Sequence, residues 1–204
     1  MSMWGIGELY DARVSRTVLK GGKNSPGLSA KTARMVLGEV YFEYYLKREV
    51  LMKLIVFDID GILTDGIVLV DESGHEYKRF LLNDIDALHQ LSRDGGVIAA
   101  ITGEDNLLAD YFKKKAPWKY FVKGCKEKLE AFKDILFKEA CSLDDAAYIG
   151  DGLYDVPVLE YVPKSICPAN AVPAAKRAAR IHLSSCGGQG CVVELYEMIK
   201  NGDI

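Results

Sequence analysis

The chain has 204 residues, of which 49% are hydrophobic and 27% are charged, and its formal net charge is −3 at pH 7. This is an ordinary globular composition, and its slightly acidic balance gives no general attraction to nucleic acid or to an anionic membrane. No uncharged apolar run approaches membrane-spanning length, and the first residues lack the pattern of a signal peptide. These features predict a soluble protein with one full hydrophobic core.

The cysteines indicate a reducing compartment. There are five of them, an odd number, and no two form a Cys-x-x-Cys pair. This usage argues against a disulfide scaffold and against a zinc knuckle. We therefore expect free thiols and a cytoplasmic location.

Residues 1–51 differ in composition from the rest of the chain. A loop rich in glycine, proline and serine covers residues 20–27, and Ser29 then stands where a helix could be capped. The apolar residues that follow have helical spacing. We expect an N-terminal extension with one amphipathic helix, whose apolar stripe docks on the main domain or on a partner subunit. Residues 21–23, Gly-Gly-Lys, lack the spacing of a phosphate-binding loop.

From residue 52 to residue 204, strand-like and helix-like patterns alternate. The expected strands cover residues 53–57, 97–101, 120–122, 146–149, 165–167 and 181–183. The expected helices cover residues 84–93, 104–115, 126–140, 155–162 and 172–179, and a last helix follows the glycines near the end. Such alternation predicts an α/β fold with a central parallel sheet and right-handed crossovers. Residues 66–82 break the alternation, since two short strand-like runs flank residues 71–74 and so predict a β-hairpin.

Polar residues follow four of the expected strands. The first strand leads into Asp58-Ile59-Asp60-Gly61, the second into Thr102-Gly103, the third into a segment ending at Lys128, and the fourth into residues 150–155, GDGLYD. In an open α/β sheet, ligands bind outside the carboxyl ends of the strands. The four segments are therefore expected to meet at one site.

The chemistry of these groups is complementary. Carboxylates that meet at one point repel each other unless a cation neutralises them, and Mg²⁺ prefers such oxygen ligands and commonly binds together with a phosphate. The threonine hydroxyl, the glycine amide and the lysine are donors for phosphate oxygens. Each feature alone has an ordinary explanation, such as a turn, a solvated helix lysine or a helix cap. Their order along the chain, each at a strand end, favours a functional site.

The ordered set of motifs resembles the haloacid dehalogenase superfamily of aspartate-nucleophile phosphotransferases. The matching pieces are DIDGILTDG at residues 58–66, ITG at 101–103, Lys128 before a helix, and GDGLYD at 150–155. Within it, the hairpin with GHEYKRF, GCKEKLEAF and the terminal GGQG are similar to the 3-deoxy-D-manno-octulosonate 8-phosphate (KDO 8-phosphate) phosphatases. The resemblance covers about residues 52–200 and implies a three-layer Rossmann-like fold with a hairpin after the first motif.

The resemblance also implies a mechanism. Asp58 would attack phosphorus to form an aspartyl-phosphate, and Asp60 would act as general acid and then as general base. Mg²⁺ would be held by the Asp58 side chain, the Asp60 backbone carbonyl and Asp151. Asp155 would lie outside the metal ligands, paired with Lys128.

The remaining donors would bind the substrate. The resemblance implies that Thr102, the Gly103 amide and Lys128 stabilise the equatorial phosphoryl oxygens. The implied substrate is a small sugar phosphate, either KDO 8-phosphate or a related keto-sugar acid phosphate.

The spacing of the motifs leaves no room for a cap domain. Residues 61–101 are used by the hairpin and one helix, and residues 103–127 by one helix and one strand. Such a site is open to solvent unless another subunit covers it. In the resembling branch the hairpins assemble a homotetramer, and the segment that matches residues 187–190 reaches toward a neighbour's site.

Three positions depart from that branch. Asn83, Glu104 and Gln189 stand where it usually has arginines. Three lost cations weaken the case for KDO 8-phosphate itself and favour a related substrate. They also leave open a second reading, a catalytically weak oligomerisation module associated with nucleotide-sugar synthesis of the sialic acid type. The intact motif aspartates and Lys128 favour the phosphatase.

Overall fold

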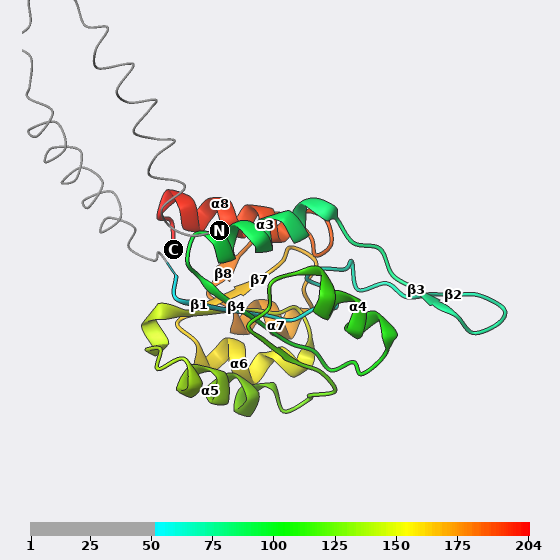
Figure 1. The fold of residues 1–204 in the computed structure, drawn as a ribbon, viewed down its shortest axis with the longest axis horizontal. Coiled ribbons are helices and arrows are strands. Elements are labelled where there is room, and N and C mark those ends of the chain that lie inside the picture. Colours follow the sequence, from blue (N-terminus) through cyan, green and yellow to red (C-terminus); the bar gives the residue numbers. More distant parts are fainter. Residues whose placement is uncertain (1–51) are drawn as a thin grey trace, which may run out of the picture. The chain divides into compact units, whose positions relative to one another are not determined.

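The computed structural model describes residues 52–204, so the expected N-terminal helix lies outside the described residues. Six parallel strands form one sheet in the order β5-β4-β1-β6-β7-β8, with helices on both faces (Figure 1). The strands are β1 (Leu54–Phe57), β4 (Val97–Ile101), β5 (Tyr120–Val122), β6 (Ala146–Ile149), β7 (Lys164–Cys167) and β8 (Ile181–His182). The predicted α/β fold is confirmed. Between residues 52 and 204, no helix is long and apolar enough to cross a membrane.

The register of the central strands brings the motifs to one edge. Strand β1 is fully buried and pairs in parallel with β4 on one side and β6 on the other. Its last residue, Phe57, lies opposite Ala100 of β4 and Ile149 of β6. The chain therefore leaves these three strands at the same level, and the segments that follow them lie side by side.

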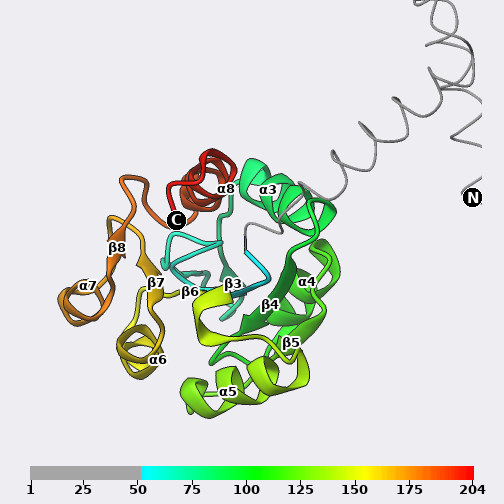
Figure 2. The same ribbon diagram turned by 90° about the vertical axis from the view of Figure 1, so that its left-hand side faces the viewer.

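Two layers of helices enclose the sheet (Figure 2). Alternate β1 side chains point to opposite faces, so Ile55 and Phe57 pack in one core and Leu54 and Val56 in the other. The first core is covered by α3 (Leu82–Arg93), α4 (Leu107–Lys115) and α8 (Cys191–Asn201). The second is covered by α5 (Lys128–Lys138), α6 (Val156–Tyr161) and α7 (Pro173–Ala178).

A buried carboxylate joins the first and last helices of the described chain. Asp84 lies in the first turn of α3 and is fully buried. Its carboxylate accepts hydrogen bonds from the amides of Gly190, Val192 and Val193 at 3.0–3.1 Å. A carboxylate at a helix N-terminus accepts hydrogen bonds from free amides and is attracted to the positive end of the helix dipole. Such an interaction stabilises the fold by about 1 kcal/mol. Asp84 thus holds α8 against α3.

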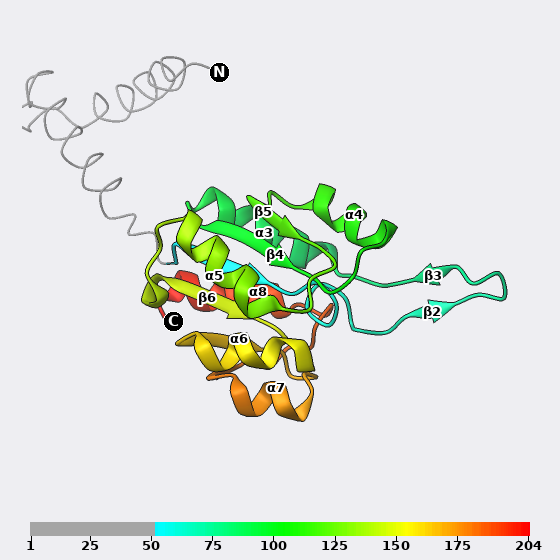
Figure 3. The same ribbon diagram turned by 90° about the horizontal axis from the view of Figure 1, so that it is seen from below.

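The predicted hairpin projects from the rest of the domain (Figures 1 and 3). Strands β2 (Leu69–Val70) and β3 (Glu76–Tyr77) are antiparallel. The turn is fixed by Asp71, whose carboxylate accepts from the amides of Ser73 and His75 at 2.9 Å. Apolar side chains on the hairpin are 43–63% exposed, namely Ile67, Val68, Leu69, Val70 and Tyr77.

Helix α4 begins later than the sequence pattern predicts. The expected start was residue 104, but the helix begins at Leu107 because the Asn106 side chain accepts from the Ala109 amide at 3.0 Å and takes the N-cap position. Glu104 therefore lies in the loop after β4, where its side chain is exposed.

Candidate functional site

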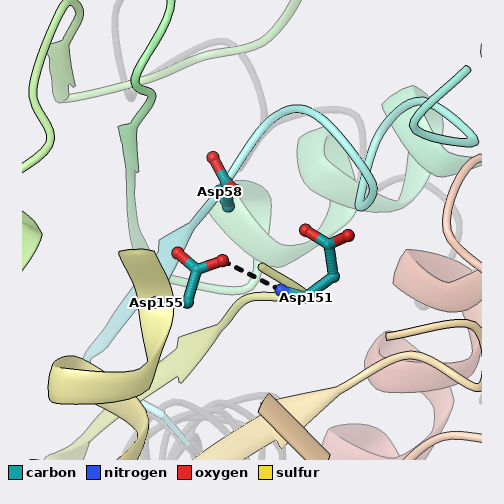
Figure 4. A group of neighbouring side chains, drawn as sticks. All are labelled: Asp58, Asp151 and Asp155. Carbon is teal, nitrogen blue, oxygen red and sulfur yellow. Dashed lines mark hydrogen bonds between the residues drawn. The ribbon is translucent and has the colours of Figure 1, made fainter. Parts of the chain in front are cut away.

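Three aspartates from two strand ends meet at the carboxyl edge of the sheet (Figure 4). Asp58 directly follows β1, and Asp151 and Asp155 follow β6. Each offers a carboxylate oxygen within 4.8 Å of the others. The expected convergence of the first and fourth motifs is therefore present in the fold.

Lys128 lies between two of these carboxylates. It is the first residue of α5, and its side chain is only 4% exposed. Its Nζ is 2.8 Å from Asp58 Oδ2 and 2.7 Å from Asp155 Oδ1. The third motif thus supplies a buried cation to the first and the fourth.

Asp155 has no free oxygen for a metal. Its Oδ1 accepts from Lys128 and from the Tyr148 hydroxyl, at 2.7 and 2.6 Å. Its Oδ2 accepts from the amides of Asp151 and Gly152, at 3.0 and 2.8 Å. Although Asp155 belongs to the carboxylate cluster, its contacts make it a support for Lys128 and for the Asp151 loop. Sequence reasoning missed Tyr148, whose signal was a single hydroxyl in an otherwise apolar strand.

Burial disfavours the charged forms of the carboxyl groups. Desolvation, followed by the charge of Asp155, raises the pKa of Asp58 well above its ordinary value. The same two causes raise the pKa of Asp151 to about 7. Burial lowers the pKa of Lys128, but the charges of Asp58 and Asp155 outweigh it, so the net shift is upward. The site therefore holds an ammonium group among carboxyls that need a further cation to ionise fully.

The donor set fits Mg²⁺. Asp58 and Asp151 offer carboxylate oxygens, and Gly61, the residue after Asp60, turns the chain beside Asp151. Gly61 has a φ of +81°, and a Cβ there would lie 2.0 Å from Asp151 Oδ2, so only glycine lets Asp151 approach this turn. Counting Asp60 and its partner Lys78, the site has four carboxyl groups against two ammonium groups. A hard divalent cation would balance that difference.

The second motif presents two free donors. Thr102 is 1% exposed, and its hydroxyl oxygen accepts from the Glu104 amide at 3.2 Å, which leaves its hydrogen available. The Gly103 amide donates to no group among residues 52–204, and the space beside its Cα is open. Both groups are therefore able to donate to an anion bound at the sheet edge.

The Asp60 side chain pairs with residues outside the three-aspartate cluster. Its Oδ1 accepts from Lys78 at 2.7 Å and from the Thr64 hydroxyl at 3.3 Å. The Asp60 side chain is 29% exposed, whereas that of Lys78 is 7% exposed. Sequence reasoning missed both partners, because Lys78 reads as part of an exposed hairpin and Thr64 as a turn residue.

The terminal glycines contact the first motif of their own chain. The Gly188 amide donates to the Ile62 carbonyl at 2.8 Å, and a Cβ on Gly187 would lie 1.7 Å from the Gly61 carbonyl oxygen. Within its own chain the segment supports the Gly61 turn, and the reach toward a neighbour that the resemblance implies stays a prediction. The three positions that depart from the branch, Asn83, Glu104 and Gln189, are all exposed.

Comparison with known sequences places the chain among phosphatases. A family of haloacid dehalogenase-like hydrolases matches residues 109–190. The KDO 8-phosphate phosphatase KdsC of Escherichia coli K12 is 31% identical over 148 residues, which cover 72% of this chain and 79% of that protein. KdsC of Yersinia pestis is 29% identical over 154 residues, covering 76% and 82%.

Similar solved structures lead to the same family. The KDO 8-phosphate phosphatase of Moraxella catarrhalis, in complex with magnesium, phosphate and KDO, has a TM-score of 0.70 and 28% identity over 78% of this chain and 92% of that one. The cobalt-bound enzyme of Haemophilus influenzae has a TM-score of 0.70 and 28% identity over 76% and 91%. This chain therefore belongs to the haloacid dehalogenase-like phosphatases, in the family that includes the KDO 8-phosphate phosphatases.

Proposed function

We propose that the protein is a Mg²⁺-dependent phosphatase that hydrolyses KDO 8-phosphate or a related keto-sugar acid phosphate through an aspartyl-phosphate on Asp58. The observation that carries this proposal is the buried bridge from Lys128 to Asp58 and Asp155 beside Asp151. It combines a nucleophile, its counter-ion and a metal ligand at one point.

Asp58 is oriented for attack on phosphorus. Its Oδ1 accepts from the Ile59 amide at 2.7 Å and its Oδ2 pairs with Lys128 at 2.8 Å. Attack by a carboxylate oxygen forms the Asp58–phosphorus bond and breaks the bond from phosphorus to the sugar oxygen. Asp60 gives its proton to that sugar oxygen. Asp60 then takes a proton from water, which attacks phosphorus and releases phosphate from Asp58.

Asp58, the Asp60 carbonyl and Asp151 would hold the magnesium ion. When bound, Mg²⁺ neutralises charge on the phosphoryl oxygens. Thr102, Gly103 and Lys128 would donate to the equatorial oxygens, where charge develops in the transition state. The magnesium and phosphate named for the Moraxella catarrhalis enzyme support this assignment.

The proposed substrate class rests on the relatives. Its details rest on three exposed positions, Asn83, Glu104 and Gln189, which we call the rim. The relatives are named for KDO 8-phosphate, an acidic sugar phosphate. Asn83, Glu104 and Gln189 bring no cation to the rim, which favours a substrate that binds differently from KDO 8-phosphate itself. The proposed substrate is therefore either KDO 8-phosphate or a related acidic sugar phosphate.

Phosphate release from a panel of sugar phosphates tests the proposal. The panel contains eight-carbon and nine-carbon keto-acid phosphates and neutral hexose phosphates, each with Mg²⁺, with EDTA, and with the variant Asp58→Asn. We expect activity that requires Mg²⁺ and is lost in the variant. A folded protein that binds Mg²⁺ and releases no phosphate would contradict the proposal. The relatives are named as phosphatases and give no support to the non-catalytic module.

We also propose that the hairpins assemble a homotetramer that covers the open sites. The exposed apolar side chains of the hairpin, centred on Leu69, support this assembly. Sedimentation velocity should show four chains for the wild type and smaller species for Leu69→Asp. Phe137→Asp is the control, because Phe137 is 85% exposed on α5 and lies outside the hairpin. A wild-type monomer would contradict the assembly.

Two predictions concern the chain as a whole. Its division into an extension over residues 1–51 and a phosphatase domain over residues 52–204 stays a prediction. So does the cytoplasmic location, with which the free state of all five cysteines is compatible.

A further inference from the structure

The two oxygens of the Asp60 carboxylate have different surroundings. Oδ1 accepts from Lys78 Nζ at 2.7 Å and from the Thr64 hydroxyl at 3.3 Å. Among residues 52–204, no donor contacts Oδ2. An ammonium group is a donor only and has no lone pair for a carboxyl hydrogen. Lys78 and Thr64 therefore occupy Oδ1, and Oδ2 is the oxygen that stays open to a ligand.

The hairpin delivers Lys78 to this position. Lys78 directly follows β3 at the base of the hairpin, and its side chain is 7% exposed although the neighbouring side chains of the hairpin are exposed. The adjacent Arg79 also pairs with the first motif, at 2.6 Å from Asp65, but its side chain is 76% exposed. Lys78 thus differs from Arg79 in being enclosed and in contacting the residue assigned to proton transfer.

We propose that Lys78 is a positioning residue that, together with Thr64, anchors Asp60 Oδ1 so that Oδ2 carries the proton to the leaving oxygen of the sugar. The inference rests on the proposed function and adds to it a residue outside the four strand-end motifs. Loss of the anchor lets the carboxyl group rotate and place its hydrogen on either oxygen. The first chemical step then slows only when the leaving group needs that proton.

The test compares two leaving groups in Lys78→Met. An alkyl sugar phosphate requires protonation of its leaving oxygen, whereas p-nitrophenyl phosphate and acetyl phosphate release stable anions. The ratio kcat/KM reports the steps up to release of the leaving group, so it excludes the later attack of water. We expect kcat/KM for the best sugar phosphate of the panel to fall by about tenfold or more, and that for the activated phosphates by less than about threefold.

Two further variants separate positioning from anchoring of the hairpin. Arg79→Ala removes the neighbouring ion pair without touching Asp60, and it should leave the ratio between the two substrate classes unchanged. Lys78→Arg keeps a charged donor and should restore part of the selective loss. Circular dichroism and sedimentation show whether each variant keeps its fold and assembly. If Lys78→Met is unfolded, Lys78→Gln provides the same comparison.

The possible failures can be distinguished. Equal losses on both substrate classes in Lys78→Met, or a selective loss of the same size in Arg79→Ala, would overturn the inference and leave the proposed function standing. A wild type that releases phosphate from neither class would overturn the proposed function, and the inference with it.

Discussion

Asp58 and Asp60 each pair with a lysine at nearly equal distance, but in different surroundings. Lys128 lies 2.8 Å from Asp58, and their side chains are 4% and 9% exposed. Asp58 directly follows strand β1, and Lys128 is the first residue of helix α5. Lys78 lies 2.7 Å from Asp60, whose side chain is 29% exposed, and it comes from the base of a projecting hairpin. The first pair is fixed by the core, whereas the second depends on a loop and a hairpin.

This difference separates two tasks. A buried pair acts in low dielectric, where charge placement has large effects on attack at phosphorus and on metal binding. The Asp60 carboxylate is partly exposed and Glu104 and Gln189 are exposed, and we expect them to face the part of the substrate beyond the phosphate. We expect substitutions in the buried part to change the rate for every substrate, and those at the rim to change the ranking of substrates.

The largest expected effect is that of Lys128→Met. It leaves Asp58 and Asp155 buried without their counter-ion, so kcat should fall by about a thousandfold or more and the free energy of unfolding by about 3 kcal/mol near neutral pH. Steady-state kinetics and urea unfolding measure both quantities. Lys126→Met is the matched control, because Lys126 is exposed and its Nζ lies over the Tyr154 ring, 5.5 Å from the ring centroid. Activity of Lys128→Met within about tenfold of the wild type would contradict the account.

Magnesium binding should depend on pH. Because the pKa of Asp151 is about 7 without metal, a proton and the cation compete for this carboxylate below that pH. Affinity should therefore be roughly thirtyfold weaker at about pH 5.5 than at about pH 8, by the fraction of Asp151 that is ionised. Isothermal titration calorimetry at the two pH values measures it.

The same pKa has a consequence for stability. A carboxyl group whose pKa is raised on folding lowers the stability of the metal-free protein as the pH rises from about 4 through about 7. Mg²⁺ should offset that loss, so it should raise the melting temperature more at about pH 8 than at about pH 5.5. Equal shifts at the two values would show that Asp151 is not a ligand.

At the rim, Glu104→Arg should alter specificity. Glu104 is exposed in the loop after β4, so the change should leave the melting temperature nearly unaffected. A cation there should favour carboxylate-bearing sugar phosphates over neutral ones by about tenfold in kcat/KM. An equal change for both substrate classes would place Glu104 outside the substrate-binding rim.

The smallest effect is expected for Tyr148→Phe. It removes one of four hydrogen bonds to Asp155 and should lower the free energy of unfolding by about 1–2 kcal/mol and kcat by a few fold. Tyr120→Phe is the control, because its hydroxyl also donates to a carboxylate, Glu139, at 2.6 Å, but at the edge strand β5. A larger kcat loss in Tyr120→Phe would contradict the role of the buried network.

The buried half of the site was predictable because most of its polar residues stand just after a strand. Asp58, Thr102 and Asp151 follow apolar runs in the sequence, and parallel pairing brings the ends of those runs to one edge. Lys128 was found through its place before a helix in the motif order. Short apolar runs also predicted all six strands of the sheet and the hairpin.

Features that depend on contacts between distant segments were not predictable. Lys78 is eighteen positions from Asp60 in the sequence, and Asp84 is over a hundred from Gly190. Contacts over such separations leave no local pattern in the sequence. Tyr148 looked like one more apolar strand residue until its hydroxyl met Asp155. The start of α4 shifted because one local cap, Asn106, outweighed the longer helical pattern.

The most direct test of the central claim is to trap the intermediate on Asp58. Asp60→Asn keeps the size of the side chain but cannot activate water, so the phosphorylated enzyme should accumulate when acetyl phosphate and Mg²⁺ are added. Intact-mass spectrometry and peptide mapping after acid quenching measure the adduct. We expect one added phosphoryl group, located on Asp58 and absent from the double variant Asp58→Asn, Asp60→Asn. A phosphoryl group on another residue, or none in a protein whose wild type is active, would contradict it.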